Sequence, residues 1–173
     1  MMTTDKPLIN KVAKSGLITI NLEKYYPKNQ IVTFDIKDYL YMELILKEKD
    51  FRQALKEHDW TQYQDKILCV FCSTDAIIPT WAFMLVTTHA VPFAADIVQT
   101  TTENYLTLAY QKALAAIDGE EYTDKRIVIK GCSNKPVPVS AYVELTKKLR
   151  PFAKSIMFGE PCSTVPIYKK PRK

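Results

Sequence analysis

The sequence predicts an α/β protein: a single domain with a mainly parallel, or mixed, sheet, helices on both faces, and an added N-terminal β-hairpin and helix. Short apolar runs alternate with longer segments of helical periodicity along the second half of the chain. The runs are residues 67–71, 127–129 and 156–158, and they predict strands over 67–71, 126–130 and 154–158. Continuous apolar runs are typical of strands covered on both faces. Strands that alternate with helices at this spacing favour right-handed crossovers and parallel pairing.

Local signals predict the other elements. Residues 17–21 and 31–35 alternate between apolar and polar side chains around a turn at 27–30, which predicts the hairpin. A helical pattern covers residues 38–46, and Asp50 with Gln53 begins another short helix as in a capping box. We further expect helices over 79–88, from about 100 to a C-cap at Gly119, and over 140–149, with a weaker strand at 95–98 and an edge segment at 165–168.

Length and composition fit one folded domain. Of 173 residues, 47% are apolar and 25% are charged, as in ordinary globular proteins. We identify no internal repeat and no linker, so residues 1–173 are expected to form a single domain with flexible ends at 1–14 and 169–173. The last five residues carry four of the net +5 charges, which leaves about +1 for the rest. This distribution does not favour a nucleic-acid partner.

The N-terminus lacks the apolar core of a signal peptide, so we expect a cytoplasmic protein with reduced thiols. Residues 76–95 carry no formal charge, but Pro79, Pro92 and His89 interrupt them. A buried helix followed by a turn explains this stretch better than a membrane span, which needs roughly 20 mainly apolar residues.

Three cysteines follow predicted strands and form the main candidate site. Cys72, Cys132 and Cys162 each precede a serine, although the chain has only six serines. If the strands are parallel neighbours, these cysteines gather at one sheet edge, where α/β proteins bind ligands. Thiolates suit zinc or an iron–sulfur cluster. Asp75 is the nearest candidate for a fourth ligand, and Glu160 is another.

Other interpretations remain open. Free cysteines are often buried core residues, as we expect for Cys69, which lies within a strand. Cys132 at a helix start could instead act as a nucleophile or persulfide carrier. His89 should lie at the opposite end of the sheet, and His58 at the surface. A structural or interaction module without a cofactor, dimeric through the N-terminal hairpin and first helices, is the third interpretation.

The cysteine motifs and their surroundings resemble a bacterial family known as domain of unknown function 2480. The resemblance covers nearly the whole chain through residues 10–18, 46–52, 72–82, 130–138 and 158–166. The three Cys-Ser positions match the family pattern, and Cys69 is not part of it. The family has no established activity. Its members often accompany genes of iron–sulfur cluster assembly, which implies assembly proteins as partners and favours metal, cluster or sulfur handling.

Overall fold

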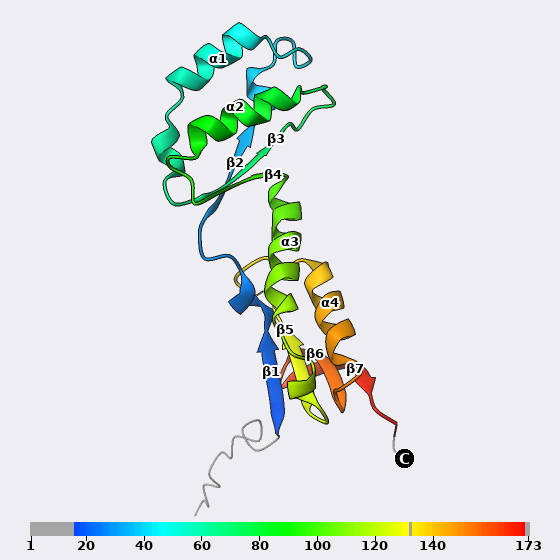
Figure 1. The fold of residues 1–173 in the computed structure, drawn as a ribbon. Helices are drawn as coiled ribbons and strands as arrows, with labels where there is room; N and C mark the ends of the chain where they lie inside the picture. The colour runs from blue at the N-terminus through cyan, green and yellow to red at the C-terminus, as the bar shows by residue number, and fades with distance from the viewer. Residues whose placement is uncertain (1–15, 132, 172–173) are drawn as a thin grey trace, which may run out of the picture. The chain divides into compact units, whose positions relative to one another are not determined.

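Two sheets, rather than one, organise the chain in the computed structural model, which describes residues 16–131 and 133–171 (Figure 1). The chain divides into two compact units. The first unit contains the residues up to Tyr26 and those from Tyr110 onward, and the second unit contains Pro27–Ala109. The α/β class is confirmed, but the expected single sheet is wrong, because β3 belongs to a different sheet from β5 and β6.

The first unit holds a four-stranded sheet in the order β1-β5-β6-β7, parallel except for the antiparallel β7. Its elements are β1 (Leu17–Asn21), the 3-10 helix η1 (Leu22–Tyr25), the 3-10 helix η4 (Glu120–Tyr122), β5 (Arg126–Lys130), α4 (Val139–Leu149), β6 (Ser155–Glu160) and β7 (Ser163–Lys169). The helix α3 (Thr102–Ala115) contributes Tyr110 and Leu114 to the core of this unit.

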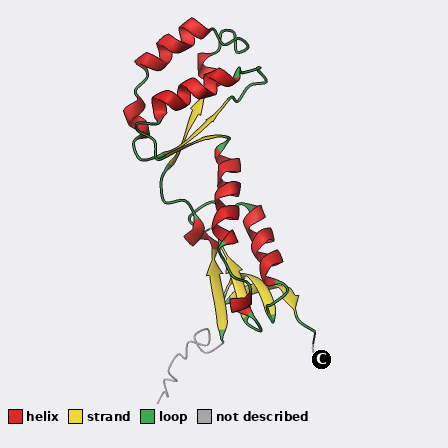
Figure 2. Ribbon diagram, viewed as in Figure 1, coloured by secondary structure: helices red, strands yellow, loops and turns green. Residues whose placement is uncertain are grey.

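The second unit holds a three-stranded parallel sheet in the order β2-β3-β4. Figure 2 shows its strands and helices by colour. Its elements are β2 (Ile31–Asp35), the 3-10 helix η2 (Ile36–Tyr39), α1 (Glu48–Glu57), the 3-10 helix η3 (Trp60–Tyr63), β3 (Ile67–Phe71), α2 (Thr80–Ala90) and β4 (Asp96–Gln99).

Each unit has its own buried apolar core, built by the central strand and its flanking helices. β3 and β5 cover the residues that the apolar runs predicted, and Leu68 and Ile127 are fully buried in them. In α4, Ala141, Leu145 and Leu149 recur every fourth residue and are buried. This spacing places them on one face of the helix, which therefore packs against the sheet.

The predicted N-terminal hairpin does not form. β1 pairs in parallel with β5, and β2 pairs in parallel with β3. Alternating side chains identify a half-buried strand, but they do not specify its partner, and here each strand borders a different sheet. The two segments are therefore edge strands of separate units.

The predicted helix over residues 38–46 is also wrong. Asp35 ends β2 and accepts a hydrogen bond from the Lys37 N–H at 3.0 Å, which begins the short η2 instead. Met42 and Glu43 then adopt positive φ angles of 50° and 58°, which no right-handed helix contains. This conformation costs non-glycine residues about 1–2 kcal/mol each.

The two units repeat the same order of elements: strand, 3-10 helix, α-helix, 3-10 helix, strand, α-helix, strand. The sheet order β2-β3-β4 of the second unit corresponds to β1-β5-β6 of the first, and all these pairings are parallel. Only β7 has no counterpart. From α1 to β4, identical residues recur 59 positions later: Tyr63 and Tyr122, Asp65 and Asp124, Lys66 and Lys125, Pro92 and Pro151, Phe93 and Phe152, Ala94 and Ala153, and Ile97 and Ile156.

Backbone hydrogen bonds follow the same correspondence. The Asp65 N–H donates to the Phe93 carbonyl at 3.0 Å, and the Asp124 N–H donates to the Phe152 carbonyl at 3.0 Å. Both aspartates have positive φ angles, 57° and 54°. The chain therefore contains an internal repeat, which corrects the expectation of none. The repeat is inconspicuous in the sequence because the second unit is inserted between β1 and the rest of the first.

Part of the expected flexible C-terminal end belongs to the first unit. Lys169 is the last residue of β7, and the Lys170 N–H donates to the Lys154 carbonyl at 2.9 Å. Residues 1–14 and 172–173 lie outside the described residues. Within the described part of the chain, no helix is long and apolar enough to cross a membrane.

The cores predict the effect of matched truncations. Leu55 and Leu114 occupy corresponding positions and are both fully buried, so Leu55→Ala and Leu114→Ala should each lower the free energy of unfolding by about 2–5 kcal/mol. Leu108→Ala removes a leucine that is 58% exposed and should change the free energy of unfolding by less than about 0.5 kcal/mol. Urea denaturation measures all three, and equal effects at the buried and exposed positions would contradict the core assignment.

Candidate functional site: the strand-end cysteines

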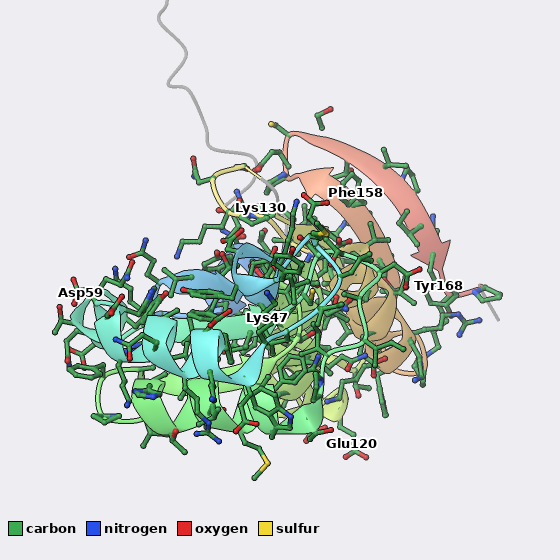
Figure 3. All side chains as sticks on the ribbon, turned by 90° about the horizontal axis from the view of Figure 1, so that it is seen from above. Lys47, Asp59, Glu120, Lys130, Phe158 and Tyr168 are labelled. Carbon is green, nitrogen blue, oxygen red and sulfur yellow. The ribbon has the colours of Figure 1, made fainter. Side chains whose placement is uncertain are left out.

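The carboxyl ends of β5 and β6 are joined by an ion pair. Lys130 is the last residue of β5, and Glu160 is the last residue of β6 (Figure 3 labels Lys130). The Lys130 Nζ lies 2.8 Å and 3.0 Å from the two carboxylate oxygens of Glu160. Because both side chains are partly exposed, the pair contributes at most about 1 kcal/mol. Its main effect is to hold the two strand ends together, two residues before Cys132 and Cys162.

The loop after β5 is held by a carboxylate from the neighbouring strand end. Glu23, in η1 just after β1, accepts hydrogen bonds from the backbone N–H groups of Ser133 and Asn134, the latter at 2.9 Å. The bond from Asn134 lowers the pKa of the Glu23 carboxyl below its ordinary value; burial opposes this, and the Ser133 bond and the charge of Lys130 add to it. Glu23 therefore stays ionised and fixes the backbone that follows Cys132.

Gly131 packs closely where the backbone leads into Cys132. A Cβ atom at this position would lie 2.7 Å from the Tyr142 hydroxyl, closer than such contacts occur, and 3.1 Å from the Val137 Cγ2, which is tighter than most. A side chain at residue 131 would therefore require the Tyr142 and Val137 side chains to shift, whereas glycine fits without any shift. Cys132 itself lies outside the described residues, so the position of its sulfur stays a prediction.

Cys162 lies exposed in the tight turn between β6 and β7. Glu160 and Ser163 are the last paired residues of this hairpin, so Pro161 and Cys162 form its tip. Gly159 precedes the turn with a φ angle of 114°, and a Cβ there would lie 2.8 Å from the Ser163 carbonyl oxygen. A side chain at residue 159 would therefore disturb the turn that presents Cys162.

The second unit holds Cys72 in a similar loop. Cys72 follows β3, is half-buried, and its sulfur lies 3.4 Å from the Thr74 hydroxyl. The next backbone N–H, of Ser73, donates to the Asp35 carboxylate at the end of β2 at 3.0 Å. Burial raises the pKa of Asp35, but the hydrogen bonds from Ser73 and Lys37 outweigh it, and the net shift is downward. In both units a carboxylate at or just after the end of the edge strand thus binds the loop that carries a Cys-Ser pair.

The structure separates the candidate ligands by unit. Cys162 and Glu160 lie in the first unit, whereas Cys72 and the exposed Asp75 share a loop of the second. The three cysteines therefore do not follow strands of one sheet, as the sequence predicted, since β2 rather than β5 is the neighbour of β3. Among the described residues, no group of three or more His, Cys, Asp or Glu side chains is placed to hold a metal ion.

Cys69 is a core residue, as expected. Its side chain is fully buried in β3, and burial raises the pKa of its thiol above the ordinary value. Such a thiol is neither a good nucleophile nor an accessible ligand.

The expectation that His58 is a surface residue is wrong. Its Nδ1 lies 3.1 Å from the Tyr39 hydroxyl and its Nε2 lies 2.9 Å from the Tyr63 hydroxyl, and its ring packs at 4.8 Å from that of Trp60. His89 also stacks on the Trp60 ring, with 5.4 Å between the two ring centres. Burial lowers the pKa of His58, partly offset by the charge of Asp59, and burial raises the pKa of Tyr63 to about 12. His58 and Tyr63 are therefore mainly neutral at pH 7, and the cluster packs against the core of the second unit.

Sequence reasoning missed Glu23, Asp35 and His58. Glu23 and Asp35 carry a recognisable signal, because each lies within two residues of the end of a predicted strand. His58 carries none, since its partners Tyr39 and Tyr63 come from two different 3-10 helices.

Thiol exposure predicts an order of alkylation. Iodoacetamide at pH 8 should modify the exposed Cys162 in the native protein, whereas the buried Cys69 should react only after unfolding. Mass spectrometry of peptides after timed exposure measures each site. Fast labelling of the peptide that contains Cys162 should persist in Cys69→Ala, and early labelling of Cys69 in the native protein would contradict its burial.

The lowered pKa of His58 predicts a pH-dependent stability. The unfolded chain binds the proton with the ordinary pKa of about 6.5, whereas the folded protein binds it only at lower pH. The contribution of His58 to the free energy of unfolding is therefore complete above that value and decreases as the pH falls below it. Urea denaturation between pH 8 and pH 5.5, values chosen to bracket a histidine pKa of about 6.5, should show this loss. The free energy of unfolding should depend less on pH in His58→Gln, and an unchanged dependence would contradict the lowered pKa of His58.

Comparison with known proteins gives a family but no activity. No curated protein and no solved structure matches the chain significantly. The sequence model of a family described as "Protein of unknown function (DUF2480)" matches residues 6–170. That match covers both units and every cysteine of the candidate site, and the chain belongs to this family.

Proposed function

We propose that the protein is a non-catalytic accessory protein that binds a metal ion or an iron–sulfur cluster through cysteine thiolates. Cys132 and Cys162 are its principal ligands, and Cys72 and Asp75 are the further candidates. The observation that carries the proposal is the ion pair at the ends of β5 and β6. Lys130 and Glu160 hold these parallel strand ends together at 2.8 Å, and each of the two cysteines follows two residues later.

The chemistry of the donors supports this function. Cysteine thiolates are preferred ligands of zinc and of iron–sulfur clusters, and two of them fill half of a tetrahedral site. Cys162 is exposed and has no protein packing to explain it, unlike Cys69. A protein of this kind would hand over or store its metal in contact with iron–sulfur assembly proteins, which the genes that accompany the family suggest as partners.

Nucleophilic or persulfide chemistry at Cys132 is the weaker alternative. The Glu23 carboxylate binds the backbone N–H groups of the two residues after Cys132. A negative charge so close disfavours a free thiolate. A bound cation offsets that repulsion, so the same surroundings accommodate a metal thiolate better than a catalytic one.

Metal analysis tests the proposal. The protein is purified both without oxygen and in air, and zinc, iron and acid-labile sulfide are measured per chain. We expect near-stoichiometric metal in at least one preparation and a loss of about tenfold or more on Cys132→Ser and on Cys162→Ser, because each removes a direct ligand.

Cys69→Ala is the matched control, because it removes a cysteine that is buried in the core. It should keep the metal. Loss of metal on Cys72→Ser would identify the third ligand, and retention would leave the site to Cys132 and Cys162. Metal-free protein in both preparations, or equal loss in the Cys69 control, would refute the proposed function.

A further inference from the structure

The second unit exposes a short apolar loop, Tyr41-Met42-Glu43-Leu44-Ile45. Its four apolar side chains are 47%, 74%, 65% and 59% exposed in chain order. Scattered exposed apolar residues are common, but four within five positions form a patch of the kind that marks an interaction surface. Glu43 lies at the centre of this apolar loop.

The backbone of the apolar loop is ordered by its own hydrogen bonds. The Tyr41 N–H donates to the Ile45 carbonyl at 2.8 Å, and the Tyr41 carbonyl accepts from the N–H groups of Leu44 and Ile45 at 3.2 Å and 3.1 Å. The Lys47 Nζ lies 3.5 Å from the centre of the Tyr41 ring. The left-handed conformations of Met42 and Glu43 would suit glycine or asparagine better. The sequence therefore keeps bulky side chains at a strained position, as interaction sites often do.

The first unit contains an apolar groove between α4 and the strands β6 and β7. It has a volume of about 700 Å³, and buried Ile129 and Ile156 line its floor. Val139 and Val143 on α4, Phe158 on β6 (Figure 3) and Ile167 on β7 line its walls and are 78%, 61%, 45% and 53% exposed. We call this the α4 groove.

The internal repeat shows that the fold does not require apolar residues at two of these positions. The second unit has the corresponding groove of about 660 Å³ beside α2. There Thr80 stands in place of Val139, and Gln99 stands in place of Phe158, 59 positions earlier in the chain. Met84 keeps the position of Val143 apolar, whereas the positions of Val139 and Phe158 are polar in the second unit. The same architecture therefore folds without these two apolar residues, and their exposure in the α4 groove indicates an occupant.

Charge indicates which occupant fits. Lys147 and Arg150 line the α4 groove. The Lys147 Nζ also lies 3.5 Å from a carboxylate oxygen of Glu144, an exposed ion pair, and Arg150 lies 3.8 Å from the centre of the Tyr168 ring. At the position of Lys147 the groove beside α2 has the neutral Thr88. An apolar segment with an acidic residue would satisfy both the walls and the basic edge, and the apolar loop with Glu43 is such a segment.

We propose that the protein forms a homodimer in which the apolar loop of each copy docks into the α4 groove of the other. Met42 and Leu44 bury their side chains against Val139, Val143 and Phe158, while Glu43 pairs with Lys147 and Arg150. The contact forms twice, because a closed dimer repeats each interaction across its two-fold axis. This proposal does not depend on the metal-binding function.

A charge exchange tests the dimer. Glu43→Lys and Arg150→Glu each place like charges in both contacts of their own dimer, so each variant should dissociate about tenfold more readily than the wild type. Mixing the two variants creates a heterodimer in which one contact is the wild-type pair and the other is its reversal. Sedimentation equilibrium should therefore show that the mixture associates as strongly as the wild type.

Matched controls exclude general charge effects. Glu121→Lys and Lys125→Glu change exposed residues outside the apolar loop and the α4 groove, and they should leave association unchanged, alone or mixed. A wild-type protein that stays monomeric at the highest concentrations measured would overturn the proposal. A dimer that the two variants weaken but their mixture does not restore would overturn it as well.

A second variant separates docking from folding. Met42→Gly removes an apolar contact but relieves a left-handed conformation. The monomer, measured in dilute solution, should be at least as stable to urea as the wild type, while dimerisation weakens about tenfold. Met84→Ala removes another methionine, 64% exposed in α2, and should not alter association. A Met42→Gly dimer as tight as the wild type would refute the docking of the apolar loop.

Discussion

Parallel pairing between an edge strand and a strand much later in the chain is the constraint on which the structure depends. Leu17 of β1 pairs with Arg126 of β5, and Ile31 of β2 pairs with Ile67 of β3. The first pairing encloses the whole second unit, and the loss of chain entropy on closing a loop grows only slowly with loop length. Because each edge strand has its own partner, the chain forms two sheets and two cores rather than one.

Parallel sheets leave polar backbone groups at their carboxyl edges, and both units satisfy them with a carboxylate. Asp35 accepts from the Ser73 N–H, and Glu23 accepts from the Ser133 and Asn134 N–H groups. These bonds are exposed, so they order the two loops rather than satisfy buried groups. As a consequence, the two loops that carry the Cys-Ser pairs are held by side chains from a neighbouring strand end, and the ion pair of Lys130 with Glu160 adds a second tie in the first unit.

The two units have kept their architecture and changed their surfaces. The second unit uses an aromatic cluster around Trp60 and His58, and its groove beside α2 has Thr80 and Gln99 where the α4 groove has Val139 and Phe158. The first unit has a glycine, Gly119, in place of Trp60, and adds β7, whose Ile167 forms a wall of the apolar α4 groove. The repeat thus provides an internal comparison: residues that both units share serve the fold, and residues that differ are where separate functions are to be sought.

Much of the fold could be predicted because its signals are local. The apolar runs predicted β3 and β5 with their exact ends, and helical periodicity predicted α4 over 140–149, within one residue of its observed start. The sequence also indicated the core role of Cys69 and the strand-end positions of Cys72, Cys132 and Cys162. Strand partners could not be predicted, because alternation along β1 and β2 identifies a face but not a neighbour. Only the tertiary structure assigned Cys72 to a separate sheet and brought His58 next to Tyr39 and Tyr63, because both depend on contacts between separate segments of the chain. Only the structure showed the strained turn at Met42 and Glu43, because side-chain periodicity does not reveal backbone angles.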